Sequence, residues 1–106
     1  MNDDTEIFEY PNGAPLAPSH PGRTLAHELE ARGLTANALA LKLRVSPNRL
    51  TDIVRGHRAI TAETAMRLGR AFGTGAQFWV NRQAQYDLAL AEQNVGDRIN
   101  REVELV

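Results

Sequence analysis

Residues 35–56 read TANALALKLRVSPNRLTDIVRG, and this stretch decides the fold. Its first half places apolar side chains at the spacing i, i+3, i+4, i+7, which is typical of the buried face of a helix. These residues are Ala36, Leu39, Ala40 and Leu43. Thr35 stands directly before them, where its hydroxyl can accept a hydrogen bond from a free backbone N–H of the first turn. The sequence therefore predicts a short helix that begins after Thr35.

A second helix is indicated by Ser46 and Pro47. Serine is a favoured N-cap, and proline suits the first helical position because its φ angle is fixed and it lacks an N–H. Only Arg44 and Val45 are left to connect the two helices. So short a connection makes the helices cross at a steep angle, which is the geometry of a helix-turn-helix.

The second helix of this pair has a polar face suited to DNA. Its apolar residues are Leu50, Ile53 and Val54. At about 100° per residue, the opposite face is centred on Asn48, Asp52 and Arg55, with Arg49 and Thr51 flanking it. Amide, guanidinium, hydroxyl and carboxylate groups together can read base edges in a major groove. The alternative is a solvated face on which Asp52 pairs with Arg49 or Arg55.

The composition is that of one small globular domain. The chain has 106 residues, of which 42% are hydrophobic, and its formal net charge is −1. It lacks any apolar run near the ~18 residues of a membrane span and any apolar signal region, so we expect a soluble cytoplasmic protein. It has no cysteine, which excludes thiol catalysis, disulfides and thiolate metal sites. No histidine spacing suggests a metal, and no cofactor is expected.

The low net charge hides a strong segregation of charge along the chain. Residues 32–70 carry eight basic side chains against two acids, a local net charge of +6, whereas the rest of the chain has a net charge of −7. Phosphate binding responds to the local patch, so this distribution favours a basic DNA-binding face at the centre of the chain.

Residues 1–18 form an expected flexible arm. They contain four acids, no basic residue and three prolines. By composition the arm needs no helix or strand. It either solvates the protein as a tail or acts as a docking segment, in which Ile7, Phe8 and Tyr10 order on a basic partner or cover a basic surface of this chain.

Two more helices and a loop surround the helix-turn-helix. A first helix is predicted from Pro21 to about Arg32, capped by Ser19 or His20 and ended by Gly33. A fourth helix is predicted after a Thr61 cap and through Phe72. Residues 57–60 form the loop between the helix-turn-helix and the fourth helix. This loop lies where a DNA backbone would pass if the second helix of the pair sat in the groove, and we expect Arg58 to contact a phosphate. The alternative is a plain surface turn.

A fifth helix is predicted from Ala76 to Glu92, with two apolar stripes. The first stripe consists of Trp79, Tyr86 and Leu90, with Phe78 beside it, and is the natural candidate for the domain core. The second consists of Val80, Ala84, Leu88 and Ala91, for which we expect a dimer interface or the returning tail as cover. The tail, residues 93–106, allows either helical or strand-like spacing, and the sequence does not decide between them. The domain division is accordingly 1–18, 19–92 and 93–106.

Several short motifs occur in a fixed order along residues 20–90. They read HPG at 20–22, SPNRL at 46–50, GHRAIT at 56–61, FGT at 72–74 and FWVNRQAQYDL at 78–88. In these motifs the chain resembles the all-α, five-helix, lambda-repressor-like (XRE-type) DNA-binding domains, and more specifically the HigA-type antitoxins of toxin–antitoxin modules. It departs from them in a longer acidic arm and in Arg23, where relatives often have glutamate.

The resemblance implies a homodimer that represses its own operon and neutralises a RelE-like ribonuclease toxin. Carried over by position, it implies DNA contacts at Thr35, Ala36, Asn37, Ser46, Pro47, Asn48, Arg49, Thr51, Asp52 and Arg55. We expect Asn48 to read an adenine and Thr51 to approach a thymine methyl. Asp52 either accepts from a cytosine amino group or orients Arg49 and Arg55, and Thr35 and Ser46 hold phosphates. Pro47 replaces a base-reading glutamine of the wider fold.

Other classes of function remain as alternatives. The nearest is a free-standing XRE-type transcription regulator of the same fold without a toxin partner. An adaptor that binds only proteins would show no affinity for DNA at low salt. An enzyme is disfavoured, since the sequence shows no plausible triad, phosphate loop or paired carboxylates.

Overall fold

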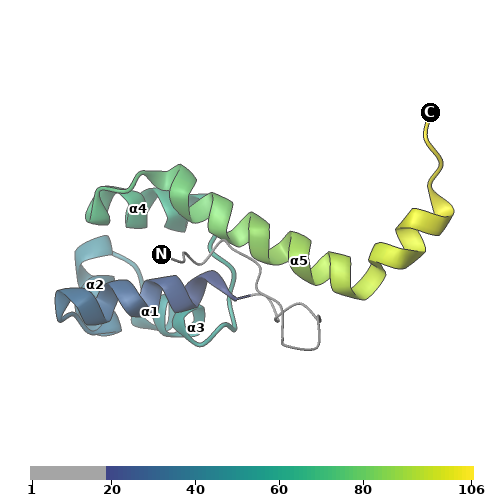
Figure 1. The fold of residues 1–106 in the computed structure, drawn as a ribbon. Helices are drawn as coiled ribbons and strands as arrows, with labels where there is room; N and C mark the ends of the chain where they lie inside the picture. Colours follow the sequence, from purple (N-terminus) through teal and green to yellow (C-terminus); the bar gives the residue numbers. More distant parts are fainter. Residues whose placement is uncertain (1–18) are drawn as a thin grey trace.

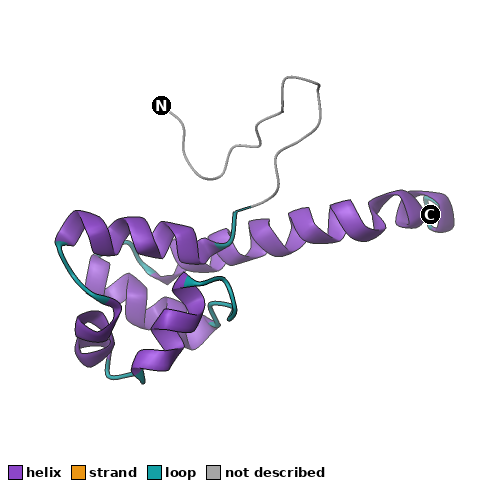
Figure 2. Ribbon diagram, turned by 90° about the horizontal axis from the view of Figure 1, so that it is seen from below, coloured by secondary structure: helices purple, strands orange, loops and turns teal. Residues whose placement is uncertain are grey.

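The computed structural model describes residues 19–106, and every regular element in that range is an α-helix (Figure 1). The helices are α1 (Pro21–Arg32), α2 (Ala36–Leu43), α3 (Pro47–Val54), α4 (Ala62–Phe72) and α5 (Ala76–Glu102). The first four are short and gather into a bundle, and the N-terminal part of α5 packs beside α4 (Figures 1 and 2). The all-α, five-helix prediction, with the helix-turn-helix as α2 and α3, is confirmed.

Each of the first four helices begins at a side-chain cap, and the four caps are residues named from the sequence. Thr35 accepts from the Ala38 N–H at 3.0 Å, and Ser46 and Thr61 accept from the third residue after them at 3.3 Å each. At α1 the cap is His20 rather than Ser19, and its Nδ1 accepts from the Gly22 N–H at 2.8 Å. Caps could be predicted because they depend only on residues a few positions apart.

The core forms where α1 to α4 meet the first turns of α5. Its apolar members are Leu25, Leu29, Leu39, Ala40, Leu43, Leu50, Ile53, Ile60, Ala65, Leu68 and Trp79. Trp79 is fully buried, its ring meets Phe72 and Phe78, and its indole N–H donates to Thr74 Oγ1 at 3.0 Å. Trp79 of the predicted stripe therefore lies in the core with Phe78 packed against it, whereas Tyr86 and Leu90 are half-buried and lie outside the core cluster.

The close approach of α1 to α3 depends on Gly22. A Cβ atom at this position would lie 1.8 Å from the carbonyl oxygen of Ile53, near the C-terminal end of α3. That is far inside van der Waals contact, so only glycine lets the first turn of α1 rest on α3. This contact fixes the end of α3 from which residues 55–60 depart.

The connection between α2 and α3 is tight. Arg44 adopts a left-handed conformation with φ 61°, and within residues 19–106 it is the only non-glycine residue with positive φ. Its N–H bonds back to the carbonyl groups of Ala40 and Leu41, which ends α2. From α4, Arg67 donates to the Leu43 carbonyl oxygen at 2.8 Å. These bonds satisfy carbonyl groups that a helix C-terminus would otherwise leave free.

The predicted end of the fifth helix was wrong. We expected it near Glu92, but α5 continues to Glu102, and its last turns extend away from the bundle (Figures 1 and 2). The tail is therefore mostly helical, and only residues 103–106 are not. The helix continues because Val95 and Ile99 prolong the apolar line of Leu88 at helical spacing. No described helix is long and apolar enough to cross a membrane, and the predicted arm, residues 1–18, lies outside the described residues.

Candidate nucleic-acid interface

The outward face of α3 is open. Asn48 and Arg55 are exposed, and Arg55 is the C-cap residue of α3 rather than part of its last turn. Thr51 is half-buried, and its hydroxyl donates to the backbone oxygens of Pro47 at 3.0 Å and Asn48 at 3.3 Å. With the hydroxyl turned back onto the helix, the methyl group of Thr51 is what remains for a partner.

Asp52 pairs with a residue that lies beyond the helix. Its Oδ2 is 3.1 Å from Nη2 of Arg58, and both side chains are partly exposed, at 38% and 48%. The pairing with Arg49 or Arg55, which the alternative of a solvated face implied, is therefore not found. The spacing rule considered only partners within the helix, whereas the turn at residues 55–60 carries Arg58 back against α3. Arg58 is thereby placed at the edge of the same face as Asp52.

Arg49 leans towards α4 rather than onto the open face. Its guanidinium lies 3.3 Å from Glu63 and 3.4 Å from the Thr64 hydroxyl, and its side chain is only 28% exposed. Glu63 also pairs with Arg67 at 3.0 Å. The hydrogen bond and charge of Arg67, followed by the charge of Arg49, lower the pKa of Glu63. Arg49 thus links α3 to α4 as well as adding positive charge.

The N-terminal ends of α2 and α3 supply the rest of the predicted contacts. Thr35 and Asn37 are exposed at the start of α2, with Ala36 half-buried between them, and Ser46 and Pro47 are exposed at the start of α3. Helix N-termini carry free N–H groups and a partial positive charge, which suits phosphate oxygens. The predicted contacts thus divide into these two N-termini, the outward face of α3, and the Arg58 turn.

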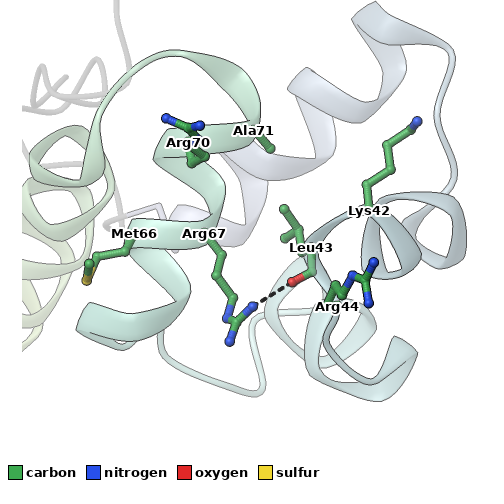
Figure 3. A pocket seen from close by; sticks show the side chains of 7 residues that line it. All are labelled: Lys42, Leu43, Arg44, Met66, Arg67, Arg70 and Ala71. Atoms are coloured by element: carbon green, nitrogen blue, oxygen red, sulfur yellow. Dashed lines mark hydrogen bonds between the residues drawn. The ribbon is translucent and has the colours of Figure 1, made fainter.

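A second basic feature was missed at the residue level. A groove of about 350 Å³ lies between α2 and α4 (Figure 3). It is lined by Lys42, Leu43, Arg44, Met66, Arg67, Arg70 and Ala71. Four of these seven side chains are cationic, and they come from both helices. The excess of basic residues over 32–70 was the available signal, but it could not place them on a shared groove.

Most of the second stripe of α5 is exposed. Leu88 is 70% exposed, and Ala84 and Ala91 are exposed beside it. Val80 differs, because it packs against the core and does not stand free with the other three. Farther along α5, the side that continues from Trp79 becomes polar at Asn94, Asp97 and Arg101, all exposed. The second stripe instead stays apolar through Val95 and Ile99, although that part of α5 has left the bundle.

Gln83 is a structural residue that the sequence reading overlooked. It is 8% exposed, and its Oε1 accepts from the Ile60 N–H at 2.7 Å, while its Nε2 donates to Asp87 at 3.0 Å. The bond ties α5 to the turn that carries Arg58. The available signal was its position, four residues after Trp79 and three before Tyr86 on the face that enters the core.

Comparison with known proteins agrees with this geometry. The family model described as "Helix-turn-helix" matches residues 25–79. Virulence-associated protein I of Dichelobacter nodosus is 55% identical over 76 residues, which span 71% of this chain and 70% of that protein. The chain therefore belongs to the helix-turn-helix family, and the domain is of the XRE type.

Solved structures narrow the assignment. An addiction module antidote protein of the HigA family from Coxiella burnetii is 43% identical with a TM-score of 0.82, over 86% of this chain and 100% of that one. The Pseudomonas aeruginosa antitoxin HigA, solved with the higBA promoter, is 46% identical with a TM-score of 0.81, over 84% of this chain and 98% of that one. Within its family the chain thus groups with the HigA antitoxins, which are DNA-binding regulators rather than enzymes.

Proposed function

We propose that the chain binds operator DNA with the outward face of α3 in the major groove, and that it acts as an antitoxin against a RelE-like ribonuclease. The observation that carries the DNA-binding part is the open face of α3. Asn48 and Arg55 are exposed on it, and Arg58 borders it through its pair with Asp52. The HigA antitoxin of P. aeruginosa was solved with the higBA promoter, which supports DNA binding by this similar chain.

The residues have distinct proposed roles in DNA binding. Asn48 makes a bidentate contact to adenine, and the Thr51 methyl packs on a thymine methyl. Asp52 orients Arg58 or accepts from a cytosine amino group. Arg49, Arg55 and Arg58 place positive charge near the DNA backbone. The N-termini of α2 and α3 approach phosphates, through Thr35, Ala36, Asn37, Ser46 and Pro47.

Substitutions at Asn48 and Arg58 separate base reading from phosphate binding. We expect Asn48→Ala to lose about 1–3 kcal/mol on the cognate operator and little on random DNA, since only the base contact is removed. Arg58→Ala should weaken binding to all sequences and reduce the slope of log affinity against log salt by about one. Titrations of cognate and random DNA at several salt concentrations measure both the loss of affinity and the salt slope.

Two exposed residues near the C-terminal end of α5 give matched controls. Asn100→Ala and Arg101→Ala repeat the same side-chain changes far from α3, and we expect neither to alter DNA affinity. Equal losses for Asn48→Ala on cognate and random DNA would contradict base reading at this position.

The proposed toxin partner is argued from family membership and charge. A ribonuclease binds RNA through a basic surface, and residues 1–18 carry four acids and no basic side chain. We expect a small basic ribonuclease to co-purify when the full chain is expressed from its native operon. Deleting residues 1–18 should reduce the amount of ribonuclease that co-purifies, without loss of operator binding.

Two results of the co-purification experiment would revise this proposal. If the ribonuclease still co-purifies after the deletion, the toxin-binding site lies elsewhere, for example on α1 or on the tail. Absence of any such partner would favour a free-standing transcription regulator of the same fold.

The proposed homodimer uses the exposed stripe of α5. Beyond the bundle, the side of α5 that continues from Trp79 is polar, whereas the opposite side keeps a line of apolar residues. Such an apolar line needs a second protein surface to cover it. Leu88, Val95 and Ile99 lie on this line. A two-fold pair of chains would place two α3 helices on successive major-groove faces, about 34 Å apart, and so require a near-palindromic operator.

A further inference from the structure

The groove between α2 and α4 gathers positive charge, and no acid is among the residues that line it (Figure 3). One of its cations, Arg67, is already engaged, since it donates to the carbonyl oxygen at the end of α2 at 2.8 Å and pairs with Glu63 at 3.0 Å. The side chains of Lys42, Arg44 and Arg70 are exposed, and within the described part of the chain they make no hydrogen bond or ion pair. The groove therefore presents three unpaired cations to an anionic partner.

The groove also has apolar walls, which distinguish it from a surface made for phosphates alone. Met66 stands on the α4 side with 65% of its surface exposed, and Leu43 and Ala71 line the groove with it. A phosphate gains nothing from an exposed thioether, whereas an aromatic or branched side chain gains by covering it. The partner that fits this groove therefore carries acids with large apolar residues between them.

Residues 3–10 of the same chain, which we call the acidic segment, have this composition. They read DDTEIFEY, with four acids, no basic residue, and the apolar side chains of Ile7, Phe8 and Tyr10. The carboxylates can pair with the cations of the groove, and the aromatic rings can cover Met66 or stack on guanidinium groups. Charge and apolar character thus match between the groove and the acidic segment.

The chain that connects the acidic segment to α1 is long enough to reach the groove. Helix α1 is about 18 Å long, and at its far end Arg32 lies over the Phe72 ring, 4.6 Å from the ring centroid. Phe72 directly follows Ala71 of the groove, so α1 spans most of the distance from His20 to the groove. Residues 11–19 contain three prolines and no charge, and nine extended residues span about 30 Å. The acidic segment can therefore reach the groove of its own chain.

We propose that the groove between α2 and α4 is the docking site of the acidic segment of the same chain. An occupant from the same chain is favoured over a separate one, because a short tether keeps it at an effective concentration of roughly millimolar. Docking needs neither operator nor toxin, so it holds or fails independently of the proposed function. One consequence does rest on that function: the acidic segment lies in the proposed toxin-binding arm, so a basic toxin would compete with the groove for it.

A spin label tests this docking in the full chain. The chain has no cysteine, so Thr5→Cys gives a single attachment point inside the acidic segment and removes neither an acid nor an apolar residue. A nitroxide attached there broadens the NMR signals of nearby amides, and chemical reduction of the label restores them. We expect the broadening to be strongest at Lys42, Arg44 and Arg70. An undocked segment would instead broaden the amides at the start of α1 and at the neighbouring Tyr86.

Two double variants of the labelled chain give a matched comparison. Lys42→Gln with Arg70→Gln removes two charges from the groove, and Arg98→Gln with Arg101→Gln removes two exposed charges from the projecting part of α5. We expect the groove variant to lower the ratio of docked to free segment about two- to tenfold, because each exposed ion pair contributes only modestly. The α5 variant should keep the wild-type pattern. Raising the salt concentration from about 0.1 M to about 1 M should also release the segment, since it shortens the screening length from about 10 Å to about 3 Å.

Three results would overturn the proposal. The first is broadening that stays centred on the start of α1, or that is equal in the two double variants. The second comes from mixing spin-labelled chains with separate isotope-labelled chains: groove signals that broaden as strongly in the mixture would place the segment of another copy in the groove. The third is a set of groove amides that respond to operator DNA but not to the label, which would assign the groove to phosphates.

Discussion

At the residue scale, Gln83 is a buried polar group with an essential partner. The Ile60 N–H is buried with it and donates to Oε1 at 2.7 Å. We expect Gln83→Leu to lower the free energy of unfolding by about 1–3 kcal/mol, because the N–H would be left without an acceptor. Gln77→Leu is the control, since Gln77 is exposed on the same helix and should change stability little. Urea unfolding of the two variants measures the difference, and equal effects would contradict this role for Gln83.

Individual residues show what could and could not be predicted from the sequence. The caps Thr35, Ser46 and Thr61 could be named because a cap and its N–H lie three residues apart. The partners of Asp52 and Arg49 could not, since Arg58 lies beyond the helix and Glu63 is 14 positions away. Their pairing depends on how the turn and α4 fold back, which local spacing does not encode.

At the scale of the element, α5 carries a weak point where it leaves the bundle. Gly96 lies within the helix, and a Cβ atom there would meet only the Glu92 side chain, at 3.2 Å. That side chain is flexible and exposed, so it can move. We expect Gly96→Ala to stabilise the projecting part of α5 by up to about 1 kcal/mol, because alanine favours a helix over glycine by that amount. Amide hydrogen exchange over residues 93–102 measures the gain.

The same substitution in α1 should have the opposite sign. Gly22→Ala places a methyl group against the Ile53 carbonyl oxygen, which is backbone and cannot rotate away. We expect a loss of more than about 2 kcal/mol in the free energy of unfolding. Thermal or urea unfolding compares the two alanine variants directly. A tolerated Gly22→Ala would mean that α1 and α3 can separate without cost.

Element boundaries were predictable wherever a stop signal exists. Gly33 and Gly73 both take left-handed conformations and end α1 and α4 where expected. Residue 92 has no such signal, so α5 was expected to end there only because the apolar stripe that includes Trp79 does not continue beyond Leu90. The helix continues because its other stripe persists, and the continuation of that stripe was the better guide.

At the scale of the whole molecule, the proposed dimer makes a testable demand on α5. Leu88→Glu adds a charge to the exposed apolar line, and we expect it to shift the protein to monomers and to weaken operator binding through loss of the second α3. Gln93→Glu adds a charge on the same helix away from that line and should leave the dimer intact. Sedimentation velocity at micromolar concentration separates the outcomes. A wild-type monomer without DNA would contradict this interface.

The unbroken course of α5 has a consequence for the operator. One continuous helix runs from Ala76 to Glu102 and carries the buried Trp79 in its first turns, so the projecting part of α5 is joined to the DNA-binding domain by helical backbone rather than by a loop. In the proposed dimer, this connection limits how far the spacing between the two α3 helices can vary. We therefore expect weaker binding to promoters with one base pair inserted between the half-sites.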